Sequence, residues 1–435
     1  MSKEKTLRVF IEVETTPSLL QALDSDKDLA GNPAAASRLS AAGLEVDPDW
    51  VPMSLSRGDG ARRTAETKVF RGHLPPGRDG GRALDIIRRE HPKIGVYADP
   101  RIDLCGLGPS DPACGTVIDV GRKLGSEDAH RRGCTGEGVT VALVDSGIDI
   151  SYLHDKGHTH SIDPDFSLVA PSATQAPGEF EPAGHGTLAA YAVGVMAPGA
   201  RLGDCATVLD GAAGDGPLMH AWLSDISIAY RRMKTMLESQ LPDERRLVVS
   251  NSWALTRPDW DFEPDQDENF SDNDEHPFNV LVTELIELGA DVLFAAGNCG
   301  HEHPVSQCGF LEQPICGANS LSAVTTVGAI DLTGKHLGYS SSGPGRLALE
   351  KPDLCAYSHF DGSGVMAVDW GTSVATPLLA GVVAGVRSQR SPVALPPEDL
   401  RRQLCETAVR TASTHDPDVG WGAVDPAALH RVLGL

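Results

Sequence analysis

The chain of 435 residues is longer than one average domain, and 41% of its residues are hydrophobic, enough to bury a sizeable core. Its 60 acidic residues outnumber its 37 basic ones and give a net charge of −23, which excludes nucleic acid and anionic membranes as expected partners. Because no short-period repeat or long low-complexity tract occurs, we expect one large α/β domain accompanied by a smaller one.

The first hundred residues alternate between strand-like and helix-like patterns. Strands are predicted at 7–14, 44–55, 68–75 and 94–99, and helices at 18–26, 34–43 and 82–91. Their order resembles β-α-β-β-α-β, the arrangement of a small ferredoxin-like α+β sandwich. We therefore predict a separate α+β domain over residues 1–103.

The N-terminal segment lacks the uninterrupted apolar run of a signal peptide, because Arg8, Glu12 and Glu14 break it. The nine cysteines are an odd number scattered over a long chain, which is typical of reduced thiols. The apolar run after Pro377 is too short to span a membrane. Together these features predict a cytoplasmic protein.

Residues 104–116 are rich in glycine, proline and small side chains, and we predict that they form a linker. Cys105 and Cys114 lie in this segment. They are interpreted as unpaired thiols, with a redox clip or a metal-binding pair as the alternatives.

The remaining residues, 117–435, show the pattern of a parallel sheet. Mostly apolar strands are predicted at 139–145, 200–208, 247–253, 291–298 and 323–330. Helices are predicted at 185–196, 217–240 and 276–289 and after the sequence GTSVATP. Continuous apolar strands imply helices on both faces, so the fold class predicted here is a three-layer α/β domain with a mostly parallel sheet.

Four polar residues follow strands or begin a helix in this domain. Asp145 ends the first strand, His185 lies in GHGT, Asn298 follows FAAG, and Ser373 precedes the apolar helix. Each by itself fits a turn or a helix cap. Together they supply what acyl transfer requires: a nucleophile, an imidazole base, a carboxylate that orients it, and an amide donor for the oxyanion.

The segments VALVDSGID, GHGTLAA, AAGN and GTSVATP resemble the signature segments of subtilisin-like serine peptidases, the subtilases. The resemblance extends roughly over residues 116–435. It implies that Asp145 orients His185, that His185 is the general base, and that Ser373 is the nucleophile. Asn298 and the backbone N–H of Ser373 would form the oxyanion hole.

The resemblance also implies substrate-binding positions. Ser252, Trp253 and Ala254 occupy the edge strand that pairs with substrate in this family, and Ala296 and Gly297 precede the oxyanion residue. Side chains stand where the family usually has glycines after this strand, which we expect to narrow the substrate pocket. The N-terminal domain resembles the family's propeptide, which serves as folding chaperone and intramolecular inhibitor.

Two further segments leave alternatives open. The acidic segment 258–277 is interpreted as a solvated surface loop, with a structural calcium site or an acidic rim that favours basic substrates as alternatives. The loop 299–316 contains Cys299, His301, His303, Cys308 and Cys316, for which zinc binding, a disulfide or free thiols are considered.

The sequence thus predicts a serine endopeptidase that acts on peptides or proteins and requires neither a cofactor nor a catalytic metal. Two alternatives remain: a peptide-tailoring transacylase, such as a macrocyclase that acts on a natural-product precursor, and a regulatory protein that its N-terminal domain holds inactive.

Overall fold

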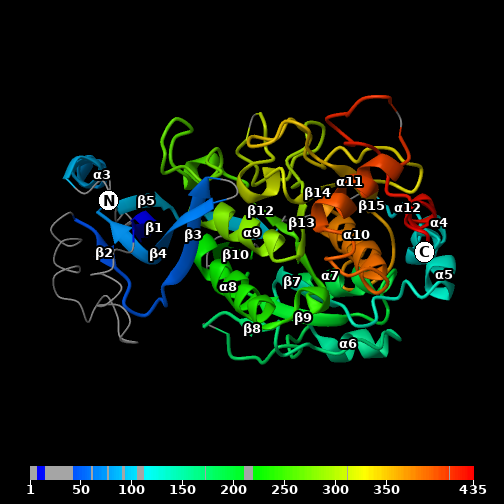
Figure 1. Ribbon diagram of the computed structural model, residues 1–435. Coiled ribbons are helices and arrows are strands. Elements are labelled where there is room, and N and C mark those ends of the chain that lie inside the picture. The colour runs from blue at the N-terminus through cyan, green and yellow to red at the C-terminus, as the bar shows by residue number, and fades with distance from the viewer. Residues whose placement is uncertain are drawn as a thin grey trace. The chain divides into compact units, whose positions relative to one another are not determined.

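The computed structural model describes residues 7–14, 43–59, 62–75, 78–90, 94–104, 112–171, 173–209, 219–310, 312–410 and 412–435. The chain divides into two compact units, whose elements are labelled in Figure 1. The first unit comprises Met1–Pro100 and Trp260–Leu281, and the second comprises Arg101–Asp259 and Val282–Leu435. Trp260–Leu281 therefore belong to the same unit as the N-terminal residues, although they are distant from them in sequence.

The first unit is built on an antiparallel sheet. Its elements are β1 (Leu7–Glu14), β2 (Glu45–Val46), β3 (Met53–Asp59), β4 (Arg62–Leu74), α3 (Arg78–Glu90) and β5 (Ile94–Ala98). The strand order is β2-β4-β1-β5, with β3 also paired to β4. Val9 and Ile11 of β1 pack with Leu84 and Ile87 of α3, so alternate side chains of the strand face this helix. The helix predicted at 18–26 and nearly all of that at 34–43 lie outside the described residues.

The acidic segment is part of this unit. His276 is buried, its Nε2 donates to the carbonyl of Ala98 at 2.8 Å, and its Nδ1 accepts the N–H of Phe278 at 3.2 Å. Burial lowers the pKa of His276 to about 3, so its ring is neutral and packs edge-on against Phe10. Glu268 is also buried and forms an ion pair with Arg88 of α3. The segment is therefore a solvated loop only in part: Glu263, Asp265 and Asp267 are exposed, whereas Glu268 and His276 are buried.

The second unit contains a seven-stranded parallel sheet, which confirms the predicted fold class. Its strands are β7 (Thr140–Asp145), β8 (Leu168–Val169), β9 (Arg201–Ala206), β11 (Leu247–Asn251), β13 (Asp291–Ala295), β14 (Thr325–Ile330) and β15 (Leu354–Tyr357). Their order is β15-β14-β13-β11-β7-β9-β8. The five longest of these strands lie within the predicted apolar runs, because a strand covered on both faces has no polar alternation.

Helices cover the parallel sheet (Figure 1). The helices after α3 are α4 (Val117–Leu124), α5 (Ser126–Arg131), α6 (Ile150–Asp155), α7 (His185–Gly194), α8 (Leu223–Ser239), α9 (Pro277–Glu287), α10 (Thr372–Arg387), α11 (Pro397–Thr407) and α12 (Pro426–Leu433), with short 3-10 turns at Pro242–Glu244, Pro258–Trp260 and Gly317–Ser320. Every residue of α10 is buried against the sheet and α7. Gly381 permits this close approach, because a Cβ there would lie 2.6 Å from the carbonyl oxygen of Val193.

A second, three-stranded sheet was not predicted. It consists of β10 (His220–Trp222), β6 (Arg101–Leu104) and β12 (Trp253–Ala254), with β6 in the middle and antiparallel to both neighbours. The helix predicted from residue 217 begins only at Leu223, because His220–Trp222 pair with β6 instead. Such a pairing depends on residues more than a hundred positions away.

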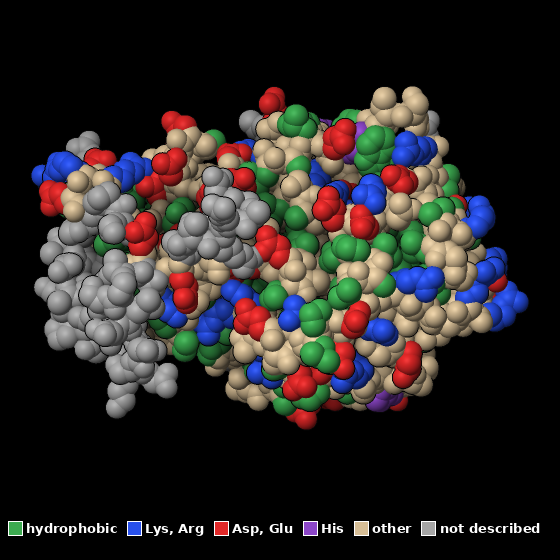
Figure 2. Space-filling view, viewed as in Figure 1, with side chains coloured by type: hydrophobic (Ala, Val, Ile, Leu, Met, Phe, Trp, Pro, Cys, Tyr) green, Lys and Arg blue, Asp and Glu red, His purple; other side chains and the backbone are tan. Residues whose placement is uncertain are grey.

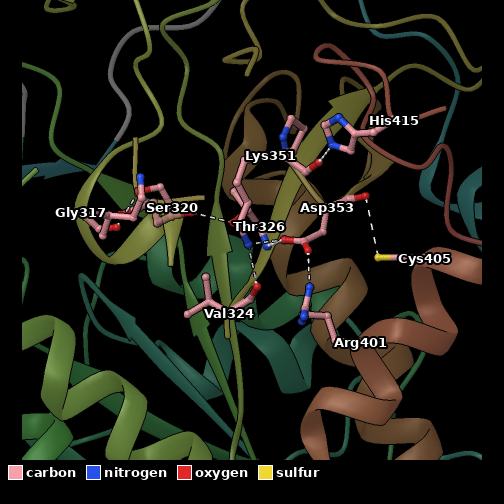
Figure 3. Close-up of polar contacts among 12 residues, drawn as sticks. Gly317, Ser320, Val324, Thr326, Lys351, Asp353, Arg401, Cys405 and His415 are labelled. Carbon is pink, nitrogen blue, oxygen red and sulfur yellow. Dashed lines mark hydrogen bonds and ion pairs between the residues drawn. The ribbon is translucent and has the colours of Figure 1, made fainter. Parts of the chain in front are cut away.

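Buried charges connect the sheet to α11 (Figure 3). Lys351 donates from Nζ to the carbonyl of Val324 at 2.9 Å and to Asp353 at 2.6 Å. Asp353 also accepts from Arg401 of α11 at 2.9 Å and from the N–H of Thr326. Burial lowers the pKa of Lys351, and the neighbouring carboxylate opposes this effect. Because the buried charges of Lys351, Asp353 and Arg401 compensate one another, we assign this cluster a structural role in the C-terminal part of the unit.

The molecular surface mixes charges of both signs. On the face shown in Figure 2, acidic and basic side chains are interspersed with hydrophobic and neutral ones. Among the residues that the structure describes, no helix has the length and apolar character needed to cross a membrane.

Candidate active site

Asp145 and His185 are in direct contact at the carboxyl end of the sheet. Asp145 is the last residue of β7, which lies between β9 and β11, and its carboxylate is buried. His185 is the first residue of α7, and its Nδ1 lies 2.9 and 3.0 Å from the two carboxylate oxygens of Asp145. The carboxylate therefore fixes the proton on Nδ1 and leaves Nε2 as the basic nitrogen.

The charge of Asp145 determines the basicity of His185. Burial lowers the pKa of His185, but the charge of Asp145 and its hydrogen bond raise it, and the net shift is upward. An imidazole that becomes a stronger base when a carboxylate stabilises its charged form suits general base catalysis.

Asn298 presents an unsatisfied amide group. It follows β13 after Ala296 and Gly297, and it is fully buried. Its Oδ1 accepts from both the backbone N–H and the hydroxyl of Thr372 at 3.0 Å. Because a backbone N–H can only donate, this contact fixes the orientation of the amide and leaves Nδ2 without a partner in the described part of the chain.

Ser373 lies beside this free donor. It is the second residue of α10, and its Oγ is buried and also has no hydrogen-bond partner among the described residues. Gly371, at φ +92°, leaves a small space in front of it. A Cβ on Gly371 would lie 2.9 Å from Asn298 Nδ2, 3.5 Å from Ser373 Oγ and 3.6 Å from Ser373 N. A hydroxyl and two N–H groups therefore lie around one point, an arrangement that could accommodate an oxyanion.

The structure thus groups the four predicted residues into two sets, Asp145 with His185 and Asn298 with Ser373. The helices that carry His185 and Ser373, α7 and α10, pack against each other. This packing follows from the small side chains in both helices, which the sequence already showed.

The predicted substrate-binding residues adjoin the serine. Ser252 donates from Oγ to the carbonyl of Ser373 at 3.1 Å. Trp253 is fully buried and packs edge-on against Phe294, so its large side chain belongs to the core. Trp253 and Ala254 form the short strand β12, and their backbone is the part that pairs with another strand.

Ala296 and Gly297 form the turn that positions Asn298. The N–H of Ala296 donates to the carbonyl of Val327, and the N–H of Gly297 donates to the hydroxyl of Thr372. Gly297 adopts φ +95°, a conformation that side chains rarely adopt. This turn links Asn298 directly to the start of α10.

β6 is paired along the edge of β12. Leu104 pairs with Trp253 and Asp103 with Ala254, while His220 of β10 pairs with Asp103 from the other side. Sequence reasoning missed β6 and β10, because residues 101–104 stood at a predicted domain boundary and 220–222 within a predicted helix. The tertiary pairing alone identifies them.

The cysteine-rich loop contains a disulfide between Cys299 and Cys308. Of the alternatives considered from the sequence, the structure therefore shows the disulfide for these two residues. Cys316 is a buried free thiol, and Cys114 is an exposed one, whereas Cys105 lies outside the described residues. In the described ranges no group of three or more potential ligands is arranged to hold a metal ion.

Asp204 lies close to Asp145 and was not predicted. It is fully buried on β9, and one carboxylate oxygen accepts the N–H groups of Gly178 at 2.8 Å and Ile148 at 3.2 Å. Burial raises the pKa of Asp204 to about 7, with a smaller contribution in the same direction from the charge of Asp145. Asp204 therefore holds the loop after β7 and retains its proton in moderately acidic solution.

Replacement of Asp204 by Asn is expected to flatten the dependence of stability on pH. In the unfolded chain the carboxyl loses its proton near pH 4, but in the folded chain it does so near pH 7. Its contribution to the free energy of unfolding is therefore present below pH 4 and lost as pH rises to 7, on the order of 2–4 kcal/mol. Asn binds no proton, so this loss disappears.

Urea unfolding between pH 4 and 8, on a Ser373→Ala background that prevents self-cleavage, measures the difference. Equal slopes for the parent and the Asp204→Asn variant would show that Asp204 is ionised in the folded state throughout.

The sequence matches a known family over most of the second unit. The model of the subtilase family, peptidase S8, matches residues 136–422. Subtilisin Savinase of Lederbergia lenta is 28% identical over 318 residues, which cover 70% of this chain and 94% of that protein. The serine protease AprX of Bacillus subtilis (strain 168) is 26% identical over 333 residues, covering 67% of this chain and 66% of that protein.

The fold is also similar to that of a solved structure. Fervidolysin of Fervidobacterium pennivorans, described as a keratinolytic enzyme related to subtilisin, superposes with a TM-score of 0.61 at 15% sequence identity. The match covers 99% of this chain, which spans 61% of the fervidolysin chain. This likeness concerns the fold alone.

Proposed function

Because the chain belongs to the subtilase family, we propose that it is a serine endopeptidase that hydrolyses peptide bonds through an acyl-enzyme on Ser373. The observation that carries this proposal is the convergence of Ser373 Oγ and Asn298 Nδ2, both buried and without partners in the described part of the chain, on the space in front of Gly371. A buried donor without a partner costs stability, so a functional reason for it is expected.

Each residue has one role in the proposed reaction. His185 takes the proton of Ser373 as Oγ attacks the scissile carbonyl, and Asp145 stabilises the imidazolium that forms. The oxyanion accepts hydrogen bonds from Asn298 Nδ2 and the N–H of Ser373. His185 then donates its proton to the departing amine, and water, deprotonated by the same imidazole, releases the acyl group.

We further propose that the N-terminal domain inhibits this site within the same chain. Peptide substrates of proteases commonly add a strand to a sheet edge, and β12 lies next to Ser373, where a substrate strand could pair with it in place of β6. β6 already pairs with β12 through Leu104 and Asp103. While β6 keeps these pairings, a substrate strand has no access to the same backbone groups.

A fluorophosphonate probe, which reacts with activated serines, tests both proposals. We expect labelling of the peptide that contains Ser373 and no labelling of a Ser373→Ala variant. Labelling should become stronger once an engineered site within residues 105–111 has been cleaved and the released N-terminal fragment has been removed. Absence of labelling in the intact and the cleaved protein would falsify the proposed enzyme activity. Equal labelling of the two forms contradicts the inhibitory role alone.

A further inference from the structure

The middle strand of the small sheet contains a buried acidic side chain. Asp103 is 1% exposed, although it lies in β6, a strand of four residues between β10 and β12. On one side its backbone partner is His220, and on the other it is Ala254. A carboxylate at this position loses nearly all of its hydration.

Two side chains compensate for this loss. His220 donates from Nδ1 to Oδ1 of Asp103, and Thr256 donates from its hydroxyl to Oδ2. Burial raises the pKa of Asp103, while the hydrogen bond from Thr256 and the charge of His220 act in the opposite direction. His220 lies on β10 and Thr256 lies two residues after β12, so neither donor belongs to β6 itself.

We infer that His220 and Thr256 form a specificity subsite that selects an aspartate side chain at the substrate position paired with Ala254. This inference rests on the proposed function, in which a substrate strand takes the place of β6 beside β12. Backbone pairing between strands does not distinguish sequences, so the side-chain contacts must provide the selectivity. Asp103 shows which side chain the two donors accommodate.

The size of the subsite favours aspartate over other residues. An apolar residue in place of aspartate removes the acceptor of the hydrogen bonds that His220 Nδ1 and the Thr256 hydroxyl donate, which is costly in a buried site. A lysine would place its charge against the imidazole. Glutamate carries one methylene more than the side chain that the two donors bracket in this structure.

The overall charge does not remove this preference. A net charge of −23 repels acidic peptides at long range, and from the sequence alone an acidic rim favouring basic substrates was one of the alternatives. At physiological ionic strength such repulsion is screened beyond about 8 Å, whereas direct hydrogen bonds inside the cleft are not. We therefore expect selection for one acidic side chain within an otherwise neutral or basic peptide.

A positional peptide set on the full-length chain tests the subsite. Asp103→Ala removes the side chain that anchors β6, and cleavage of an engineered site within residues 105–111, followed by removal of the released N-terminal fragment, provides a second way to free the cleft. In both preparations, peptides carry Asp, Asn, Ala or Lys at each of the four positions before the cleaved bond, and the cleaved bond is identified by mass spectrometry.

We expect kcat/KM for Asp to exceed that for Ala by about 30-fold or more at a single position, as is typical when one partner of a buried hydrogen-bonded charge pair is removed. His220→Leu combined with Thr256→Val should reduce this ratio below about 3-fold while Ala peptides are still cleaved. Thr235→Val, a change at an exposed residue of α8, serves as the control and should keep the ratio.

Cleavage of Asp and Ala peptides with equal kcat/KM at all four positions overturns the subsite and leaves the peptidase proposal intact. Probe labelling of Ser373 without cleavage of any peptide overturns the placement of substrate on β12, and with it this inference. Absence of both labelling and cleavage contradicts the proposed function itself.

Discussion

Replacement of Asp145 by Asn is expected to lower kcat for peptide hydrolysis by about 10⁴-fold while the protein stays folded. The carboxylate oxygens of Asp145 lie 2.9 and 3.0 Å from Nδ1 of His185, so they accept its proton and leave Nε2 free. An asparagine amide at this position donates a hydrogen bond to Nδ1 and thereby favours the wrong tautomer. It also removes the charge that stabilises the imidazolium.

The pH dependence of kcat provides a second measurement. The charge of Asp145 contributes to the raised pKa of His185, and a base acts only when it is unprotonated. In Asp145→Asn the pKa of His185 should fall, so the residual activity should begin at a lower pH than in the parent. A purely structural role of Asp145 would not shift the acidic limb of the dependence of kcat on pH.

Asp149→Asn is the matched control. Asp149 is buried four residues away and caps α6 by accepting the N–H of Tyr152, a role that asparagine also performs. We expect kcat to change by less than about 2-fold in this variant. A loss below about 10-fold in Asp145→Asn would contradict the proposed role of Asp145.

Replacement of Asn298 by Ala is expected to lower kcat by about 10²–10³-fold with little change in KM. Asn298 Nδ2 has no partner in the described residues, and it faces the space in front of Gly371 beside Ser373. It would therefore form its hydrogen bond only when the oxyanion appears, so its loss affects the transition state and not the bound substrate.

Asn298→Asp separates this role from a structural one. The variant keeps an oxygen that accepts from the N–H and hydroxyl of Thr372, but it replaces the donor with a second oxygen. Its thermal stability should be closer to that of the parent than that of Asn298→Ala, whereas its kcat should be as low or lower. Normal turnover by either variant would remove Asn298 from the oxyanion hole.

Contacts of the acidic segment 258–277 determine whether the N-terminal domain stays bound after the chain is cleaved between the two domains. Its residues His276 and Glu268 contact Ala98 and Arg88, which belong to the N-terminal domain by sequence. The segment itself is continuous in the chain with the second unit at both of its ends. A cut after residue 104 therefore leaves these noncovalent contacts intact.

Sequence by itself determined the parts of the molecule in which local pattern and chemistry coincide. Mostly apolar runs identified β7, β9, β11, β13 and β14, because strands buried on both faces show no regular alternation of polar and apolar residues. Small residues around each polar group also marked the ends of these strands, where parallel sheets form their sites. Asp145 ends β7 and Asn298 follows β13, whereas His185 and Ser373 lie in the first turns of α7 and α10.

Only the tertiary structure decided the pairings between distant segments. The sequence around His220 fits a helix, and residues 101–104 alone are too short to indicate a strand, but each becomes a strand because the other is present. In the acidic segment, Glu268 and Glu275 form ion pairs with Arg88 and Arg57 from another part of the chain, which the local sequence does not indicate. Such contacts depend on which surfaces meet, and local sequence patterns do not contain that information.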